Sequence, residues 1–294
     1  MPLTHTSTFK VRHYECDAYG HLNSVNYVRY MQEAAFDASA AAGWDLPRYD
    51  SIGRLWLVRE TEIDYLAPVY YGDAVDVTTW VMDMRKVRSR RAYELHHAAT
   101  GALVGRASTD WAFLETATGR PAAIPQDMIG VFFESGVPDE APPRRRFPSP
   151  PAPPADVFRQ RRQVEWRDLD PGQHVNNATY VAYLEECGVQ VDNSLGWTDA
   201  RYRQASIEVY TRRHWIEYQA QAVLNDELEI ATWLSDIRTT SLTRHYTITR
   251  LSDGAAVAQA HSVYVWVDAG TGRPTPIPAG QLADFAPNLS PEKP

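Results

Sequence analysis

Apolar residues recur at helical spacing in two stretches of the chain. In the first stretch they step by three or four positions and share one face of a helix; they are Val28, Met31, Ala35, Ala38 and Ala42. The same steps recur at Val181, Leu184, Gly188, Val191 and Leu195. Asn23 or Ser24 is a suitable N-cap for the first stretch, and Gly43 is a suitable stop. The pattern predicts two long helices, and the small residues of the first allow close packing against another layer.

Strand-like segments surround each predicted helix. Residues 8–14 alternate and predict a short strand before the first helix. Four longer runs rich in Val, Ile, Thr, Tyr and Trp follow each helix, separated by turn residues. These runs cover 54–66, 74–85, 89–100 and 103–115 in the first half, and 205–219, 226–237, 240–252 and 256–268 in the second. Each half is therefore predicted to be a strand, a long helix and an antiparallel meander, which form a two-layer α+β domain.

The two halves are copies of each other in a constant register. Asp17 aligns with Asp170, a shift of 153 residues (170 − 17), and the same shift aligns further identical residues without a gap. In the first half these are His21, Asn23, Tyr27, Val28, Tyr30, Glu33, Gly43, Trp44, Tyr65, Asp73, Trp80, Arg91 and Gly101, followed by the run 118–121. This register predicts a duplicated domain. We expect a first domain at 1–128, a proline-rich linker at 129–156, a second domain at 157–285 and a tail at 286–294.

Composition narrows the function classes. Of the 294 residues 44% are hydrophobic, so each half can bury an ordinary core. The formal net charge of −8 argues against sequence-independent nucleic-acid binding, which needs a basic face. The only cysteines, Cys16 and Cys187, are not paired by the repeat, which disfavours a disulfide and excludes a zinc knuckle. The first residues do not form a signal peptide, and no apolar run is long enough for a membrane span, so we expect a cytoplasmic protein.

The linker combines prolines with arginines. Eight prolines between residues 137 and 155 predict an extended, stiff connector that joins no sheet. Arg144, Arg145 and Arg146 lie in this connector, and Arg159, Arg161 and Arg162 follow it. Such a run indicates either a docking patch for an anionic partner or simply a solvated linker, which is its more frequent use.

A similar motif stands at each predicted loop–helix junction. The stretch 17–23, DAYGHLN, resembles the 4-hydroxybenzoyl-CoA thioesterase branch of the hotdog-fold acyl thioesterases. The stretch 168–177, DLDPGQHVNN, is similar to the catalytic half of plant and bacterial acyl-acyl-carrier-protein thioesterases. The resemblance covers almost the whole chain outside the linker and the tail. It implies a double hotdog, in which each sheet wraps round its long helix. The two units are expected to pair edge to edge, with active sites at their interface. Symmetry also favours association of two such chains into a homodimer.

The second copy departs from the family pattern at two positions. The acyl-carrier-protein enzymes have an asparagine where this chain has Gly172, and a glutamate where it has His214. The first loop keeps its glycine–histidine pair intact. We therefore expect two unequal sites, with Asp17 carrying more of the turnover than Asp170.

The motif residues suit thioester hydrolysis. Asp17 and Asp170 precede the helices by a few residues, where a carboxylate can act as general base or as nucleophile. A helix N-terminus presents unpaired N–H groups to a developing oxyanion. His21 and His174 either position the substrate, tune the aspartate, or only hold the loop by local bonds. Asn23 and Asn176 are predicted helix caps that also shape the oxyanion site.

Further candidates lie on the helices and on one hairpin. Glu33 and Glu186 are expected either to orient the catalytic loop, to act as bases, or to bond a tyrosine or the backbone. Tyr27 and Tyr180 are candidate substrate contacts. In the family, the turn that carries Lys86, Arg88, Arg90 and Arg91 lies near the pantetheine and nucleotide end of the substrate; the alternative is a solvated cationic hairpin.

The resulting hypothesis is a thioesterase that releases a carboxylic acid from CoA or from an acyl-carrier protein. We expect no cofactor, because the sequence has no metal-ligand spacing or phosphate-binding glycine loop. Two alternatives stay open: a double-hotdog hydratase, whose expected D-x-x-x-x-H motif followed by proline is absent, and a catalytically silent acyl-binding protein.

Overall fold

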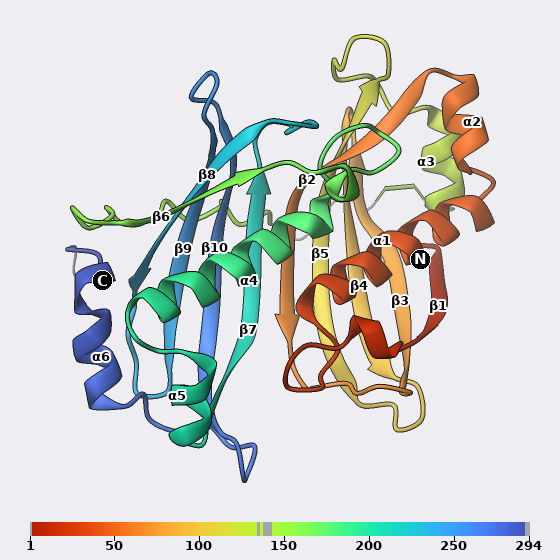
Figure 1. Ribbon diagram of the computed structural model, residues 1–294. Coiled ribbons are helices and arrows are strands. Elements are labelled where there is room, and N and C mark those ends of the chain that lie inside the picture. The colour runs from red at the N-terminus through yellow and green to blue at the C-terminus, as the bar shows by residue number, and fades with distance from the viewer. Residues whose placement is uncertain (1, 134–135, 138–142, 292–294) are drawn as a thin grey trace. The chain divides into compact units, whose positions relative to one another are not determined.

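The computed structural model describes residues 2–133, 136–137 and 143–291, which form two compact units (Figure 1). The first unit spans Met1–Arg146 and the second spans Phe147–Pro294. The change from one unit to the next therefore falls inside the segment expected to be the linker. None of the helices in the described ranges is both long and apolar enough to cross a membrane.

The first unit is an antiparallel sheet covered by a long helix. Its strands are β1 (Thr4–Lys10), β2 (Arg54–Tyr65), β3 (Ala74–Arg85), β4 (Arg88–His97) and β5 (Leu103–Glu115), in the order β1-β3-β4-β5-β2. Its helices are α1 (Ser24–Ala41), α2 (Leu46–Ser51) and α3 (Gln126–Phe132), with the 3-10 turn η1 (His13–Glu15). Figure 1 shows α1 lying across one face of this sheet.

The second unit repeats this arrangement element by element. Its strands are β6 (Phe158–Gln163), β7 (Ile207–Tyr218), β8 (Glu227–Ser235), β9 (Ser241–Arg250) and β10 (Ala256–Asp268), in the order β7-β10-β9-β8-β6. Its helices are α4 (Asn177–Ser194), α5 (Asp199–Gln204) and α6 (Ala279–Phe285), with the 3-10 turns η2 (Trp166–Asp168) and η3 (Ala286–Asn288). The predicted fold class, a tandem hotdog in which a sheet surrounds a long helix, is confirmed.

The predicted meander strands are all present, with ends that shift by up to three residues, as at 100 against His97. The prediction of a strand at 8–14 is wrong at both ends, since β1 runs from Thr4 to Lys10. The strand ends at Lys10, because the Glu15 carboxylate accepts the Arg12 N–H at 2.7 Å and closes the turn η1. Periodicity also missed the short helices α2, α3, α5 and α6, which are too short to show a helical period.

The predicted helical stripe faces the core. Val28 and Met31 are almost completely buried, and Ala35 and Ala38 are buried beside them. Asn23 caps α1 by accepting the Val25 N–H at 2.9 Å, as predicted. Past its C-terminus Gly43 has φ +76°, a left-handed conformation that glycine adopts without steric cost.

A buried histidine makes the stability of the second unit sensitive to acid. His214 in β7 is fully buried, with Nδ1 2.7 Å from Ser262 Oγ, and burial lowers its pKa to about 3. The unfolded histidine takes up a proton as the pH falls below about 6.5, whereas the folded one stays neutral down to about 3. Stability linked to His214 is therefore complete above about pH 6.5 and is lost as the pH falls through this window.

We expect the unfolding free energy of the wild type to fall by about 2 kcal/mol from pH 7 to pH 5 because of His214. The matched variant is His214→Thr, because Thr61 occupies the same register position in the first unit (214 − 153 = 61). Urea unfolding at both pH values should show a smaller pH dependence in His214→Thr by about this amount. Equal pH dependence of the two proteins would contradict the assignment.

Candidate active site

The loop before α4 brings three predicted residues together around one carboxylate. Oδ1 of Asp170 accepts the Gly172 N–H at 2.8 Å and lies 3.6 Å from Nδ1 of His174. Its Oδ2 lies 3.5 Å from Nδ2 of Asn176. The Asp170 N–H donates to the His174 carbonyl at 3.0 Å and closes the loop. A carboxylate, an imidazole and an amide therefore converge, as acid–base chemistry requires.

Gly172 makes this convergence sterically possible. A Cβ added at this residue would lie 2.9 Å from Nε2 of His174, closer than Cβ atoms come to their neighbours, and 3.0 Å from Oδ1 of Asp170, a tight contact. The next residue, Gln173, has φ 62°, a left-handed conformation that is costly outside glycine. The asparagine that the family resemblance led us to expect at 172 would displace the imidazole. The glycine at 172, which departs from the family pattern, therefore leaves the space in which His174 lies beside Asp170.

The N-terminus of α4 lies next to this cluster. Oδ1 of Asn176 accepts the Ala178 N–H at 2.9 Å, so Asn176 both caps the helix and contacts Asp170. Among the residues that the structure describes, no acceptor bonds the N–H of Asn177, the first residue of the helix. This amide lies at the positive end of the helix dipole and is a donor for a developing negative charge.

The corresponding loop of the first unit has the same backbone path. The Asp17 N–H donates to the His21 carbonyl at 2.8 Å, and Oδ1 of Asp17 accepts the N–H groups of Tyr19 and His21 at 2.9 and 3.0 Å. The imidazole of His21 packs edge-to-face on Tyr70, with ring centroids 5.1 Å apart. Asp17, His21 and Asn23 therefore share one loop at the start of α1.

The tyrosines predicted to contact substrate are core residues. Tyr27 and Tyr180 are each 3% exposed, and burial raises the pKa of both. They pack edge-to-face on Tyr65 and Tyr218, whose hydroxyls donate to the carbonyl of the first helical residue at 3.2 and 3.1 Å. This placement anchors the helix N-termini to the sheets. A substrate contact through either tyrosine stays a prediction.

The helix glutamates lie away from the loops. Glu33 and Glu186 are exposed on the solvent side of α1 and α4. Partial burial and the Asp37 carboxylate raise the pKa of Glu33, and Glu186 accepts a bond from Gln190 Nε2 at 2.7 Å. No contact between these glutamates and the aspartates of the loops is seen in the described ranges. Their catalytic role stays a prediction.

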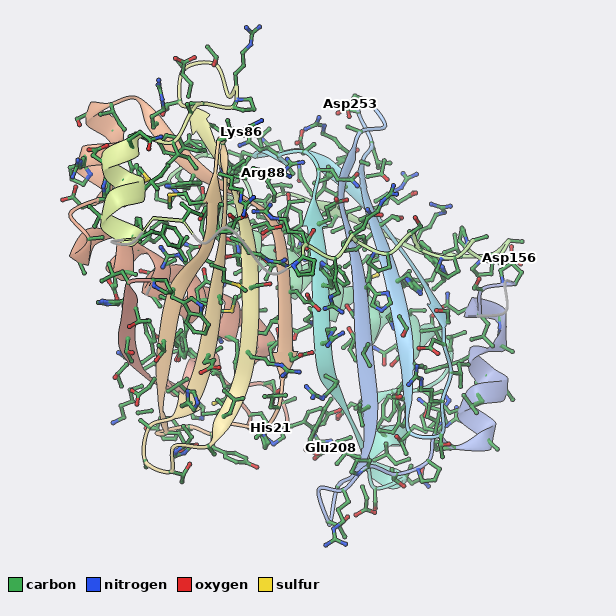
Figure 2. The ribbon with its side chains drawn as sticks, turned by 180° about the vertical axis from the view of Figure 1, so that it is seen from behind. His21, Lys86, Arg88, Asp156, Glu208 and Asp253 are labelled. Atoms are coloured by element: carbon green, nitrogen blue, oxygen red, sulfur yellow. The ribbon has the colours of Figure 1, made fainter. Side chains whose placement is uncertain are left out.

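The cationic hairpin splits into buried and exposed members. Arg90 is 9% exposed and lies 3.5 Å from Asp110, and Arg91 is 6% exposed. Lys86 and Arg88 are exposed (Figure 2). Figure 2 also shows that His21 lies at the opposite end of the first unit's sheet, which agrees with the roughly 36 Å that the 12 residues of β3 span. Within this unit the structure therefore does not bring the hairpin and the Asp17 loop together.

Two arginines of the linker are engaged by the first unit. Arg144 lies 3.6 Å from Asp83 and 3.5 Å from Asp110, and Arg145 pairs with Glu62. These pairs hold the connector against the sheet. For Arg144 and Arg145 these ion pairs therefore make a docking patch for an anionic partner the less favoured of the two alternatives.

The sequence analysis missed a pair of acids that support the helix tyrosines. The Tyr30 hydroxyl donates to Glu15 at 2.7 Å. The register equivalent of Glu15 is Asp168 (15 + 153 = 168), which together with burial raises the pKa of Tyr183. An acid two residues before each loop aspartate is the signal that could have revealed this pair. Across the described residues there is no cluster of three metal-ligating side chains.

Comparison with known families agrees with this geometry. The model of the thioesterase-like superfamily matches residues 11–132 and again residues 164–285. An acyl-[acyl-carrier-protein] hydrolase of Cuphea viscosissima is 28% identical over 196 residues, which cover 63% of this chain and 47% of that protein. A palmitoyl-acyl carrier protein thioesterase of Arabidopsis thaliana is 28% identical over 193 residues, with the same coverage. The chain matches about half the length of these relatives.

Two solved structures share the fold over nearly the whole chain. The 12:0-ACP thioesterase from Umbellularia californica superposes with a TM-score of 0.72 at 20% identity and covers 92% of this chain and 94% of its own. An acyl-ACP thioesterase from Bacteroides thetaiotaomicron superposes with a TM-score of 0.66 at 18% identity, covering 89% and 97%. At these identities the likeness establishes the tandem arrangement of the fold.

Proposed function

The chain belongs to the thioesterase-like superfamily, and on this premise we propose that it hydrolyses acyl thioesters to a free carboxylic acid and a thiol. One observation carries the proposal. The carboxylate of Asp170 is held by the Gly172 N–H, His174 and Asn176 next to the N-terminus of α4. An oriented base beside an unpaired helix amide is what attack of water on a thioester carbonyl requires.

In the proposed reaction Asp170 acts as the general base. It removes a proton from water while the water oxygen attacks the thioester carbon, and the Asn177 N–H stabilises the oxyanion. The tetrahedral intermediate then expels the thiolate, which takes the proton from Asp170. His174 and Asn176 act as positioning residues, because both contact the carboxylate. In the alternative, the carboxylate attacks the thioester carbon directly and water hydrolyses the resulting anhydride.

The substrates we propose are acyl groups carried by an acyl-carrier protein or by CoA. The relatives named above act on acyl-carrier-protein thioesters, and the match to them covers 63% of this chain. Both carriers present the same thioester group, so the chemistry at Asp170 does not distinguish them.

A substrate panel tests the function directly. Acyl-CoA and acyl-carrier-protein thioesters of several chain lengths are supplied, and the released thiol is followed with a thiol reagent. Thiol release that depends on Asp170 supports hydrolysis. Hydration of an enoyl thioester without thiol release would instead identify a hydratase, and binding without either reaction would identify a silent acyl-binding protein.

The exposed hairpin provides a separate prediction on carrier recognition. Both carriers are acidic and the chain has a net charge of −8, so a local cationic cluster would favour encounter. Replacing Lys86 and Arg88 by alanine should raise KM for a carrier-linked thioester several-fold, more strongly at low salt, and leave kcat unchanged. Arg90 is excluded from this variant because it is buried against Asp110. Equal losses on an uncharged pantetheine-like thioester would contradict docking at the hairpin.

A further inference from the structure

A buried arginine of the second unit is paired with a carboxylate that belongs to a polar network. Arg244 in β9 is 3% exposed and donates from Nη2 to Oδ1 of Asp192 in α4 at 2.7 Å. The other oxygen of Asp192 accepts the Tyr202 hydroxyl at 3.0 Å. Tyr202 in turn accepts from Gln281 Nε2 at 2.6 Å, and Gln281 accepts the Trp266 N–H at 2.7 Å. The buried positive charge therefore has a partly buried negative counter-charge.

The first unit keeps the arginine but not its network. The register equivalent of Arg244 is Arg91, and Ser39 stands where Asp192 does (192 − 153 = 39). Met128 and Phe113 replace Gln281 and Trp266 by the same shift. Of the network's acceptors only the tyrosine is retained, as Tyr49.

Arg91 has no carboxylate partner in the described part of the chain. Its Nη1 lies 3.4 Å from Oγ1 of Thr79, and its guanidinium lies 5.6 Å from the ring of Phe132. Burial lowers its pKa, and the groups that oppose this shift are Tyr93 and Tyr49, both neutral hydroxyls. A buried charge without a counter-ion costs several kcal/mol, so Arg91 is a candidate binding point for an anion.

The surroundings of Arg91 specify the rest of such a ligand. Apolar side chains of the core cluster around Trp44, Phe113 and Phe132 pack at this end of the unit. At one position of the core-facing stripe α1 also has a smaller side chain than α4, since Ala38 stands where the second unit has Val191. A ligand that places an anion on Arg91 must therefore carry an apolar chain.

We propose that the core of the first unit binds the carboxylate of an apolar-chain acid on Arg91, with the hydroxyls of Ser39 and Tyr49 beside it. The carboxylate has two sources. It is either a free fatty acid, the product class of thioester hydrolysis, or the distal carboxylate of a dicarboxylic acyl thioester. The second source rests on the proposed function, whereas binding of the free acid does not.

The test compares acids with alcohols of equal chain length. Isothermal titration with octanoate, dodecanoate and hexadecanoate should show at least one acid binding tenfold or more tightly than its alcohol. Ser39→Asp supplies the counter-ion that the second unit has, and should abolish this preference. Ser39→Asn is the matched control of equal size without charge, and should retain it. Circular dichroism checks that both variants fold, and Arg91→Met, which should also abolish the preference, provides an independent second route.

Two further measurements distinguish the two sources of the bound carboxylate. A distal carboxylate predicts that Ser39→Asp lowers kcat/KM at least tenfold more for dodecanedioyl thioesters than for dodecanoyl thioesters. A product site predicts that Ser39→Asp relieves inhibition by dodecanoate instead. Equal binding of acids and alcohols to the wild type, or an acid preference that survives Ser39→Asp, would overturn the proposal. Acid binding without any thioester hydrolysis would refute the proposed function alone.

Discussion

Replacing Asp170 by asparagine should lower kcat/KM for thioester hydrolysis by roughly 10²–10⁴-fold, because an amide cannot accept the proton of the attacking water. The exchange preserves the local geometry, since an asparagine Oδ1 can still accept the Gly172 N–H that the aspartate accepts at 2.8 Å. Steady-state kinetics with an acyl-CoA or acyl-carrier-protein thioester measures the loss. Unchanged unfolding in urea would show that the loss is chemical.

The matched variant is Asp17→Asn in the first unit, whose Oδ1 likewise keeps the Tyr19 and His21 N–H bonds. We weighted Asp17 above Asp170 from the sequence because of the glycine at 172. The structure removes that reason, since Gly172 makes room for His174 beside Asp170. We therefore expect the larger loss at Asp170. A loss confined to Asp17→Asn would assign the turnover to the first unit and refute the role of Asp170.

A third variant tests the space at residue 172. In Gly172→Ala the new methyl group would lie 2.9 Å from Nε2 of His174 unless the ring moves. The imidazole should then leave Asp170, and kcat should fall while KM changes little, because the base is misoriented. A fully active Gly172→Ala enzyme would mean that His174 has no part in positioning the carboxylate.

Replacing Arg244 by methionine should lower the unfolding free energy by about 3–5 kcal/mol, because it leaves Asp192 buried without its counter-ion. The side chain of Arg244 is 4% exposed and that of Asp192 is 17% exposed, with Nη2 and Oδ1 2.7 Å apart. Burial already raises the pKa of Asp192 and Arg244 opposes that shift, so without Arg244 the carboxylate is costly to ionise. The loss should therefore be larger at neutral pH than in acid, where the carboxyl is protonated. Urea unfolding at the two pH values measures both effects.

Two controls belong to this prediction. The double variant Arg244→Met with Asp192→Ser copies the neutral residue at Ser39 and should recover most of the loss, since neither charge then remains unpaired. Arg91→Met in the first unit breaks no ion pair within the described ranges and should be nearly neutral or stabilising. Equal destabilisation by Arg91→Met and Arg244→Met would show that the two arginines play the same structural part.

Much of the candidate site could be predicted from local sequence. The caps Asn23 and Asn176, the stop at Gly43 and the aspartates before the helices depend on residues within a few positions of one another. The supporting acid Glu15 escaped notice because its partner, Tyr30, lies 15 residues further along the chain. No local period connects such pairs.

By itself the sequence determined the duplication, the helix and strand pattern and the order of elements, because each follows from spacing along the chain or from comparing the chain with itself. It could not determine what an identical residue does in each copy. Arg91 and Arg244 occupy the same register position in the same kind of strand, yet among the described residues only Arg244 meets a carboxylate. That difference arises at Ser39 in α1 and Asp192 in α4, each 52 positions before the arginine of its unit. Folding packs each helix over the strand that carries the arginine. Burial and charge pairing are set by neighbours in space, and only the tertiary structure chooses them.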